Sequence, residues 1–231
     1  MKKLAYSILS AALFSVIAVS ASAQGQSRSV SGFNAISSGG PFNVHVKIDG
    51  NESLKIDADN DIINDIETTV EGNTLKIKFK DRENRHWNNR KVDIYVEAKS
   101  LNALANAGSG SLRVEGVVSG GNVKTILSGS GDISTAVKAD QLRTVISGSG
   151  SIKITGSAGE AQIVVTGSGQ VEGSDLKTNS VSATITGSGN IHVQAEKSVS
   201  GHITGSGNVI YSGSASITDV RTTGSGRVSR E

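Results

Sequence analysis

Apolar and polar positions alternate along most of the chain, in a fixed phase relative to a recurring tripeptide. An aliphatic residue stands two positions after each tripeptide, and the residue between them is polar. A period of two predicts β-strands. The tripeptide Gly-Ser-Gly occurs seven times, at intervals of 18 to 21 residues, beginning at Gly108, Gly129, Gly148, Gly167, Gly187, Gly205 and Gly224. A sustained period of this length predicts a solenoid, because each repeat then adds one coil.

The aliphatic residues on both sides of the tripeptide form columns from coil to coil. The column that follows it is Leu112, Ile133, Ile152, Val171, Ile191, Val209 and Val228, and the column that precedes it begins Leu127, Ile146, Val165, Ile185 and Ile203. Each coil therefore holds two short strands, and the tripeptide is the corner between two sheets. We predict an all-β fold, a right-handed parallel β-helix (a two-sheet β-solenoid) with Gly-Ser-Gly corners about every 20 residues. Glycine suits such a corner because it accepts positive φ and lets stacked backbones approach.

The opposite corner of each coil is irregular in sequence and in length. It reads "EGVVSGG", "KADQ", "TGSAGE", "EGSDLKTNS", "AEKS" and "SGSAS" in successive repeats. In repeat proteins the variable side is often the binding side. We therefore expect the variable rim to carry recognition.

The first 23 residues have the pattern of a secretory signal peptide. Lys2 and Lys3 precede an apolar run, and Ala21-Ser22-Ala23 forms a cleavage site. The alternative is an uncleaved membrane anchor, which the short, serine-broken apolar run disfavours. We expect cleavage after Ala23, no transmembrane segment in the mature chain, and export to the periplasm, the outer surface or the medium.

Residues 24–231 are predicted to form a single β-solenoid domain, with N-terminal coils and a cap over 30–105 and the Gly-Ser-Gly coils over 106–231. The segments "PFNVHVKI", "SLKIDA", "TLKIKF" and "KVDIYVEA" alternate as strands do. "EGN" reads as a hairpin turn, and "DNDIINDIET" is consistent with one helical turn. Solenoids need such caps at their ends.

The stretch "GFNAISSGGPFNVHVKIDGNESLKIDADNDIINDIETTVEGNTLKIKF", followed by serial Gly-Ser-Gly coils, resembles the GIN-domain family. This family of unknown function, common in Bacteroidota, is described as the head of an auto-transporter adhesin. The resemblance covers about residues 31 to 215. It implies a right-handed parallel β-helix similar in shape to pectin lyases, without known catalytic residues, and a role in adhesion. The chain ends within a coil at Glu231, so we expect it not to translocate itself.

Composition narrows the function further. The chain has no cysteine, which argues against disulfides, thiolate zinc sites and a lipoprotein anchor. Removal of Lys2 and Lys3 with the signal leaves 21 basic and 21 acidic residues. A balanced chain without a basic face is not expected to bind nucleic acid.

Catalytic chemistry is poorly represented in the repeats. Only Asp132 is acidic among the residues directly after the tripeptides, and Lys153 beside Glu172 reads as a solvated surface pair. The four histidines are scattered. We expect no catalytic, cofactor-binding or metal-binding residues, and a non-enzymatic module for adhesion or ligand binding, with a glycan as one candidate ligand. Two alternatives stay open, a structural scaffold of the envelope and a polysaccharide-active enzyme.

The segment "KDRENRHWNNRK" contains the only tryptophan, between two predicted strands. Trp87, Arg85, His86 and Arg90 are candidates for contact with a surface component or glycan, because exposed Trp and Arg often anchor recognition. The alternative is a solvated hairpin whose tryptophan packs back onto the solenoid.

A second candidate surface is an outward column that begins with three β-branched residues, Ile126, Val145 and Val164. We predict that this packing ridge is at least half buried, by the N-terminal segment or by a partner chain in a homo-oligomer. The alternative is the general preference of β-branched residues for strands.

Overall fold

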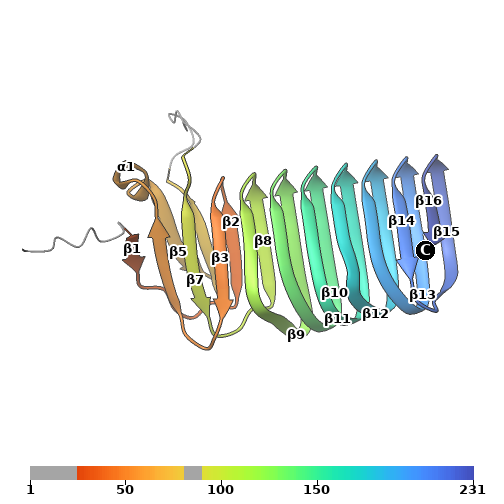
Figure 1. The fold of residues 1–231 in the computed structure, drawn as a ribbon, viewed down its shortest axis with the longest axis horizontal. Coiled ribbons are helices and arrows are strands. Elements are labelled where there is room, and N and C mark those ends of the chain that lie inside the picture. The colour runs from red at the N-terminus through yellow and green to blue at the C-terminus, as the bar shows by residue number, and fades with distance from the viewer. Residues whose placement is uncertain (1–24, 81–89) are drawn as a thin grey trace, which may run out of the picture.

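The computed structural model describes residues 25–80 and 90–231, which form a β-solenoid of about seven turns (Figure 1). Strands make up 75% of it, so the fold is all-β, as predicted. The predicted signal peptide, 1–23, lies outside the described residues. In chain order the elements are β1 (Gly25–Arg28), β2 (Ala35–Gly39), β3 (Asn43–Ile48), β4 (Ser53–Asp57), α1 (Asn60–Ile63), β5 (Ile66–Glu71), β6 (Thr74–Phe79), β7 (Asp93–Ala98), β8 (Ala103–Gly108), β9 (Ser111–Gly129), β10 (Asp132–Gly148), β11 (Ser151–Gly167), β12 (Gln170–Gly187), β13 (Asn190–Gly205), β14 (Asn208–Ser212), β15 (Ser216–Gly224) and β16 (Arg227–Arg230).

Each of the long strands β9 to β13 follows a whole coil, from one Gly-Ser-Gly corner to the next. The coils pair in parallel, and their repeats are in register. Ile133 is aligned with Leu112 on one side and with Ile152 on the other. The aliphatic columns predicted from the alternation are therefore the stacked rungs of the sheet.

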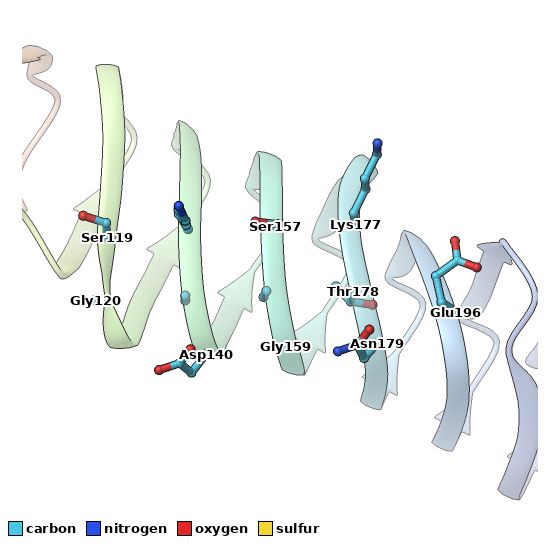
Figure 2. A pocket seen from close by; sticks show the side chains of 12 residues that line it. Ser119, Gly120, Asp140, Ser157, Gly159, Lys177, Thr178, Asn179 and Glu196 are labelled. Atoms are coloured by element: carbon cyan, nitrogen blue, oxygen red, sulfur yellow. The ribbon is translucent and has the colours of Figure 1, made fainter.

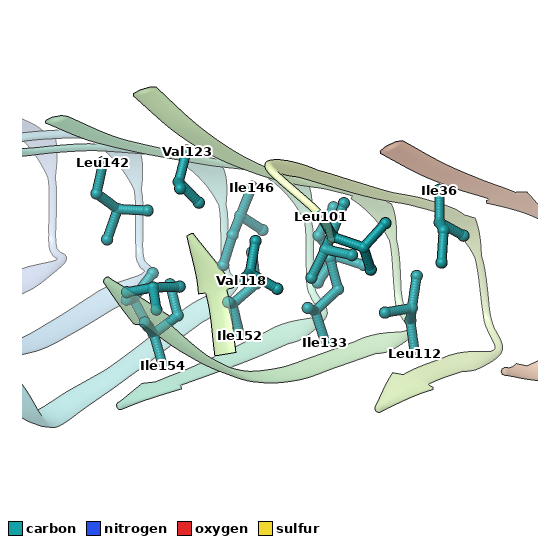
Figure 3. Close-up of a cluster of buried hydrophobic side chains, with 14 of the residues drawn as sticks. Ile36, Leu101, Leu112, Val118, Val123, Ile133, Leu142, Ile146, Ile152 and Ile154 are labelled. Atoms are coloured by element: carbon teal, nitrogen blue, oxygen red, sulfur yellow. The ribbon is translucent and has the colours of Figure 1, made fainter. Parts of the chain in front are cut away.

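The columns fill the interior of the solenoid with aliphatic side chains (Figure 3). Ile146 and Ile152 are fully buried. Full burial of one such side chain stabilises the fold by about 1.5–3 kcal/mol. Thr125 and Thr144 are also buried in one of these columns, where their hydroxyls share a hydrogen bond of 2.9 Å. The core thus repeats one small set of contacts from coil to coil.

The two glycines of a Gly-Ser-Gly corner serve different purposes. Gly167 has a φ of +111°, and a Cβ there would lie 2.5 Å from the carbonyl oxygen of Gly148 in the coil below. Gly169 faces the core, where a Cβ would lie 2.5 Å from Cγ2 of Ile146. Ser168 between them is exposed, and its backbone N–H donates to the Gly148 carbonyl over 3.0 Å. The corner therefore requires its glycines and tolerates its serine.

The N-terminal coils are stacked in an order that differs from the order of the chain. The coil made by β2 and β3 lies between β6–β7 on one side and β8–β9 on the other, and all of these pairs are parallel. Its corner is Gly39-Gly40-Pro41 in place of Gly-Ser-Gly. The N–H of Gly110 donates to the Gly40 carbonyl over 3.3 Å, so this corner continues the line of the others.

Antiparallel strands close the N-terminal end of the solenoid. β4 pairs with β7 and β1 with β4, while β5 pairs with β6 through a tight turn in which Gly72 and Asn73 have φ of 54° and 64°. The hairpin predicted at "EGN" is thus confirmed. The predicted helical turn is α1, whose Ile62 and Ile63 are buried at the end of the core.

Arg28 ties β1 to this cap. Its guanidinium donates to the carbonyls of Ile66 (2.6 Å) and Ile63 (2.8 Å) and to the hydroxyl of Thr68 (3.1 Å). The carbonyls of Ile63 and Ile66 are thereby paired, as partly buried backbone groups require. Partial burial lowers the pKa of Arg28, which stays charged.

The C-terminal end of the described stack is open. Ile217 and Val220 continue inward columns, since they align with Val199 and Gly201, yet they are 47% and 39% exposed. A bulge interrupts β15 between Ile217 and Asp219, and Arg230 aligns with the buried Tyr211. A bulge and a charge in an inward column both discourage pairing with another strand edge.

Candidate functional site

The variable rim, opposite the Gly-Ser-Gly corners, carries a trough of about 580 Å³ over β9 to β13 (Figure 2). Small side chains form its floor. Gly120, Ala139, Ala158 and Thr178 are aligned in register from one coil to the next, and the last two are buried. Because these side chains are small, a ligand can approach the backbone along the rim.

Larger polar side chains stand on both margins of the trough at two of its coils. β10 contributes Lys138 and Asp140, and β12 contributes Lys177 and Asn179. Figure 2 shows Asp140 and Asn179 along one margin and Lys177 extending from the other. All four residues are exposed, and within residues 25–80 and 90–231 none of their side chains has an ion pair or a hydrogen bond. These four groups are therefore free to bind a ligand.

Glu196 on β13 closes the C-terminal end of the trough. Its carboxylate accepts hydrogen bonds from the Ser214 hydroxyl (2.7 Å), the Ser214 N–H (3.3 Å) and Nε2 of Gln194 (3.0 Å). The hydroxyl of Ser214 contributes most to holding the pKa of Glu196 below its usual value, followed by Gln194. Glu196 is thus a fixed negative charge whose acceptor sites are largely occupied.

A second hollow, of about 430 Å³, follows the same coils on the adjoining sheet face. It is lined by long polar side chains that include Lys124, Arg143 and Gln162. The Arg143 guanidinium donates to Oε1 of Gln162, so two of these side chains bind one another. The polar groups of this second hollow are therefore less available to a ligand than those of the trough.

The residues predicted as a partner or glycan contact are described only in part. Arg85, His86 and Trp87 lie outside the described residues. Arg90 is placed at the N-terminal cap, where its guanidinium is 3.1 Å from Asp59 and 2.9 Å from Asp61, and hydrogen bonds to both carboxylates, that to Asp59 first, raise its pKa. The structure places Arg90 beside α1 rather than in the trough, and recognition by residues 85–90 stays a prediction.

Tyr95 is an exposed aromatic side chain that the prediction missed. It lies on the outer face of β7, is 46% exposed, and stacks on His45 of β3 with ring centroids 5.2 Å apart. Nε2 of His45 lies 3.4 Å from Oδ1 of Asp93. The alternation in "KVDIYVEA" contained the signal, because it places Tyr95 outward.

The predicted packing ridge is aligned as expected, since Val145 pairs with Ile126 and with Val164. Ile126 is 39% exposed, and the two valines are half-buried. β1 pairs with β4 at the N-terminal edge of the sheet, and Ala105 of β8 is aligned beside Ile126. Burial of the ridge by the N-terminal segment or by a partner chain stays a prediction.

A lysine in place of Val145 tests the ridge. If a second chain covers it, Val145→Lys buries a charge in the contact, and the mass in solution should fall to that of the monomer. The measurement is light scattering together with thermal unfolding. Thr184→Lys, in the same column beyond the ridge, is the control. Unchanged mass and unchanged stability in Val145→Lys would rule the ridge out as a contact.

The fold and the trough define a β-solenoid with four free polar groups on its variable edge. The model of a family described as "Putative auto-transporter adhesin, head GIN domain" matches residues 32–215. The chain belongs to this family, as the sequence resemblance indicated. A comparison with curated proteins gives no match.

Solved structures show the same fold. A "putative adhesin" from Bacteroides fragilis is 26% identical, with a TM-score of 0.82 over 90% of this chain and 96% of that one. A "putative adhesin" and a "putative lipid binding protein" from Parabacteroides distasonis, each 23% identical, have TM-scores of 0.72 and 0.71 over the same shares of the chains. At that identity the last two support the fold alone. No helix in the described ranges is long and apolar enough to span a membrane.

Proposed function

We propose that the protein is an exported, non-enzymatic adhesion module that holds a surface component of another cell or matrix along the rim trough. The family description and the name of the Bacteroides fragilis structure support adhesion. The observation that carries the proposal is the set of four unpartnered polar side chains, Lys138, Asp140, Lys177 and Asn179, over a floor of small residues. A glycan is the proposed ligand class, because such groups suit hydroxyl-rich polymers.

Binding rather than turnover is proposed because of how the carboxylates of the trough are spaced. Asp140 lies on β10 and Glu196 on β13, three rungs apart in the stack. Three rungs correspond to about 14 Å. Glycoside hydrolysis uses two carboxyl groups about 5–10 Å apart across the scissile bond. This spacing disfavours a pair of catalytic acids in the trough.

A charged side chain in the middle of the trough tests the proposal. Ser157 is exposed on β11 between the two polar pairs, so Ser157→Arg should fill the space without unfolding the protein. We expect binding to a glycan array, or to intact cells, to fall at least about tenfold, which is about 1.4 kcal/mol. Ser149→Arg, at the exposed Gly-Ser-Gly corner before the same coil, is the matched control.

The same assay separates the trough from the predicted contact at residues 85–90. If Trp87→Ala abolishes binding and Ser157→Arg leaves it unchanged, the site lies at the tryptophan and not on the rim. If neither the parent chain nor its variants bind the glycan array or intact cells, the result would count against adhesion. Fractionation of cells with an antibody that locates the chain only in the periplasm would do so as well.

A further inference from the structure

Over β9 to β12 the trough has a period of two coils, which is longer than the one-coil period of the fold. Its rim triplets read Ser-Gly-Gly at 119–121, Lys-Ala-Asp at 138–140, Ser-Ala-Gly at 157–159 and Lys-Thr-Asn at 177–179. Their first and second residues are aligned in register across the stack. From β9 to β12, coils with two polar side chains therefore alternate with coils whose side chains are small. The next coil, Gln194-Ala195-Glu196, is polar and ends the alternation.

The alternation sets the distance between equivalent groups. Neighbouring rungs of a sheet are about 4.8 Å apart. Lys138 and Lys177 lie two rungs apart, so their backbone positions are about 10 Å from each other along the axis of the solenoid. This is about the length of one disaccharide unit in an extended polysaccharide. The four triplets span two such units.

We propose that the trough binds a linear polysaccharide with a disaccharide repeat that carries one acidic group, lying along the axis of the solenoid. The inference rests on the proposed function and names the ligand class of its site. Each lysine binds the carboxylate or sulfate of one repeat, as ammonium groups do in charge-assisted hydrogen bonds. Asp140 and Asn179, on the other margin, bind the hydroxyl groups of the same sugar.

The small coils take the second sugar of each repeat. At 157–159 the floor is Ala158 and the margins are Ser157 and Gly159, so a sugar ring can lie closer to the backbone there than at the lysines. Serine in place of lysine leaves no cation for a second acidic group. A neutral polymer has no acidic group to bind the ammonium groups of Lys138 and Lys177.

The negative charges of the rim argue against ligands with an acid on every sugar. Asp140 stands opposite Lys138, and the ionised Glu196 closes the C-terminal end. A uniform polyanion would place charges beside both carboxylates, which costs binding energy. A phosphate backbone would meet the same repulsion. The rim therefore favours one acid per two sugars.

Three polysaccharides of defined charge pattern test the ligand class on the full mature chain. Hyaluronan has one carboxylate per disaccharide, polygalacturonate has one on every sugar, and dextran has none. We expect hyaluronan to bind at least about tenfold more tightly than the other two, by calorimetry at low and physiological salt. Hyaluronan tetrasaccharides should bind much more tightly than disaccharides, because they engage both lysines.

The lysines provide the matched variants. Lys138→Ala and Lys177→Ala should each weaken hyaluronan binding about tenfold and reduce its dependence on salt. Lys153→Ala removes an exposed lysine of β11 that does not line the trough, and it should bind as the parent does. Equal loss in all three variants would show nonspecific attraction and overturn the inference.

The outcomes distinguish this inference from the proposed function. If dextran or polygalacturonate binds as tightly as hyaluronan, and Ser157→Arg blocks it, the charge pattern is wrong while binding in the trough stands. If the parent chain binds other glycans on the array but none of the three polymers, the inference fails alone. If it binds no glycan and no cell surface, both fail.

Discussion

Replacing Ile152 with aspartate is expected to abolish cooperative folding of the solenoid. Ile152 is fully buried, aligned between Ile133 and Val171 in the column that follows the corners. A carboxylate there would lie among aliphatic side chains without a partner, and protonation would still leave a buried polar group. We expect a loss of at least about 4 kcal/mol, a large part of the stability of an ordinary domain.

The neighbouring residue provides the control for this prediction. Lys153 is exposed on the same strand, so Lys153→Asp should change the free energy of unfolding by no more than about 0.5 kcal/mol. Circular dichroism during urea and thermal unfolding measures both variants. If Ile152→Asp melts within a few degrees of the parent, the inward column is assigned incorrectly.

The second large effect is expected at the corner, where three adjacent substitutions should differ in rank. Gly167→Val meets both a φ of +111° and the carbonyl of Gly148, and it should cost about 3 kcal/mol or more. Gly169→Val meets Cγ2 of Ile146 and the Gly150 carbonyl and should also be strongly destabilising. Ser168→Ala removes only an exposed hydroxyl and should stay within about 0.5 kcal/mol.

The same unfolding experiments rank the three variants. Valine is β-branched, which makes positive φ especially unfavourable, so Gly167→Ala should fall between Gly167→Val and the parent. An effect of Ser168→Ala as large as that of Gly169→Val would contradict the division of roles in the corner.

Much of the fold was predictable because the repeats contain their own alignment. Ile133, Ile152 and Val171 hold the same place relative to Gly-Ser-Gly, and that place determines both the face and the rung. The position of the β2–β3 coil was not predicted. β2 and β6 have the same alternation of apolar and polar residues, so the sequence pattern does not distinguish their places in the stack. Their order depends on contacts between residues that are distant in sequence. "SSGGPF" contained a signal, because Gly39-Gly40 occupies a corner.

The candidate site was predictable in location and not in composition. The variable rim was expected to carry recognition, yet the two-coil alternation emerges only when rims of unequal length are aligned in space. Lys138 and Lys177, for example, become second neighbours because Ser157 pairs with both. The outward position of Tyr95 could be read from the alternation of its strand. Its stacking on His45 could not, because it depends on the pairing of β3 with β7.

The inserted β2–β3 coil also has a consequence for the order in which the chain can fold. Stacked partners in the repeats are close in sequence, as with Thr125 and Thr144, 19 residues apart. Asn43 of β3 instead bonds to Asp93 and Ser111, which are 50 and 68 residues away. Closing these longer loops costs more entropy, and contacts of high sequence separation slow folding.

The β2–β3 coil is therefore the link that joins two otherwise separate stacks. The repeats from β9 onward can assemble coil by coil through local pairing. Among the strands of residues 25–80 and 90–231, β6 and β7 of the cap pair toward the repeats through β2 and β3 alone. We therefore expect the first coil to be synthesised to be the last to be enclosed, and the slow step of folding to lie at the N-terminal end, away from the rim trough.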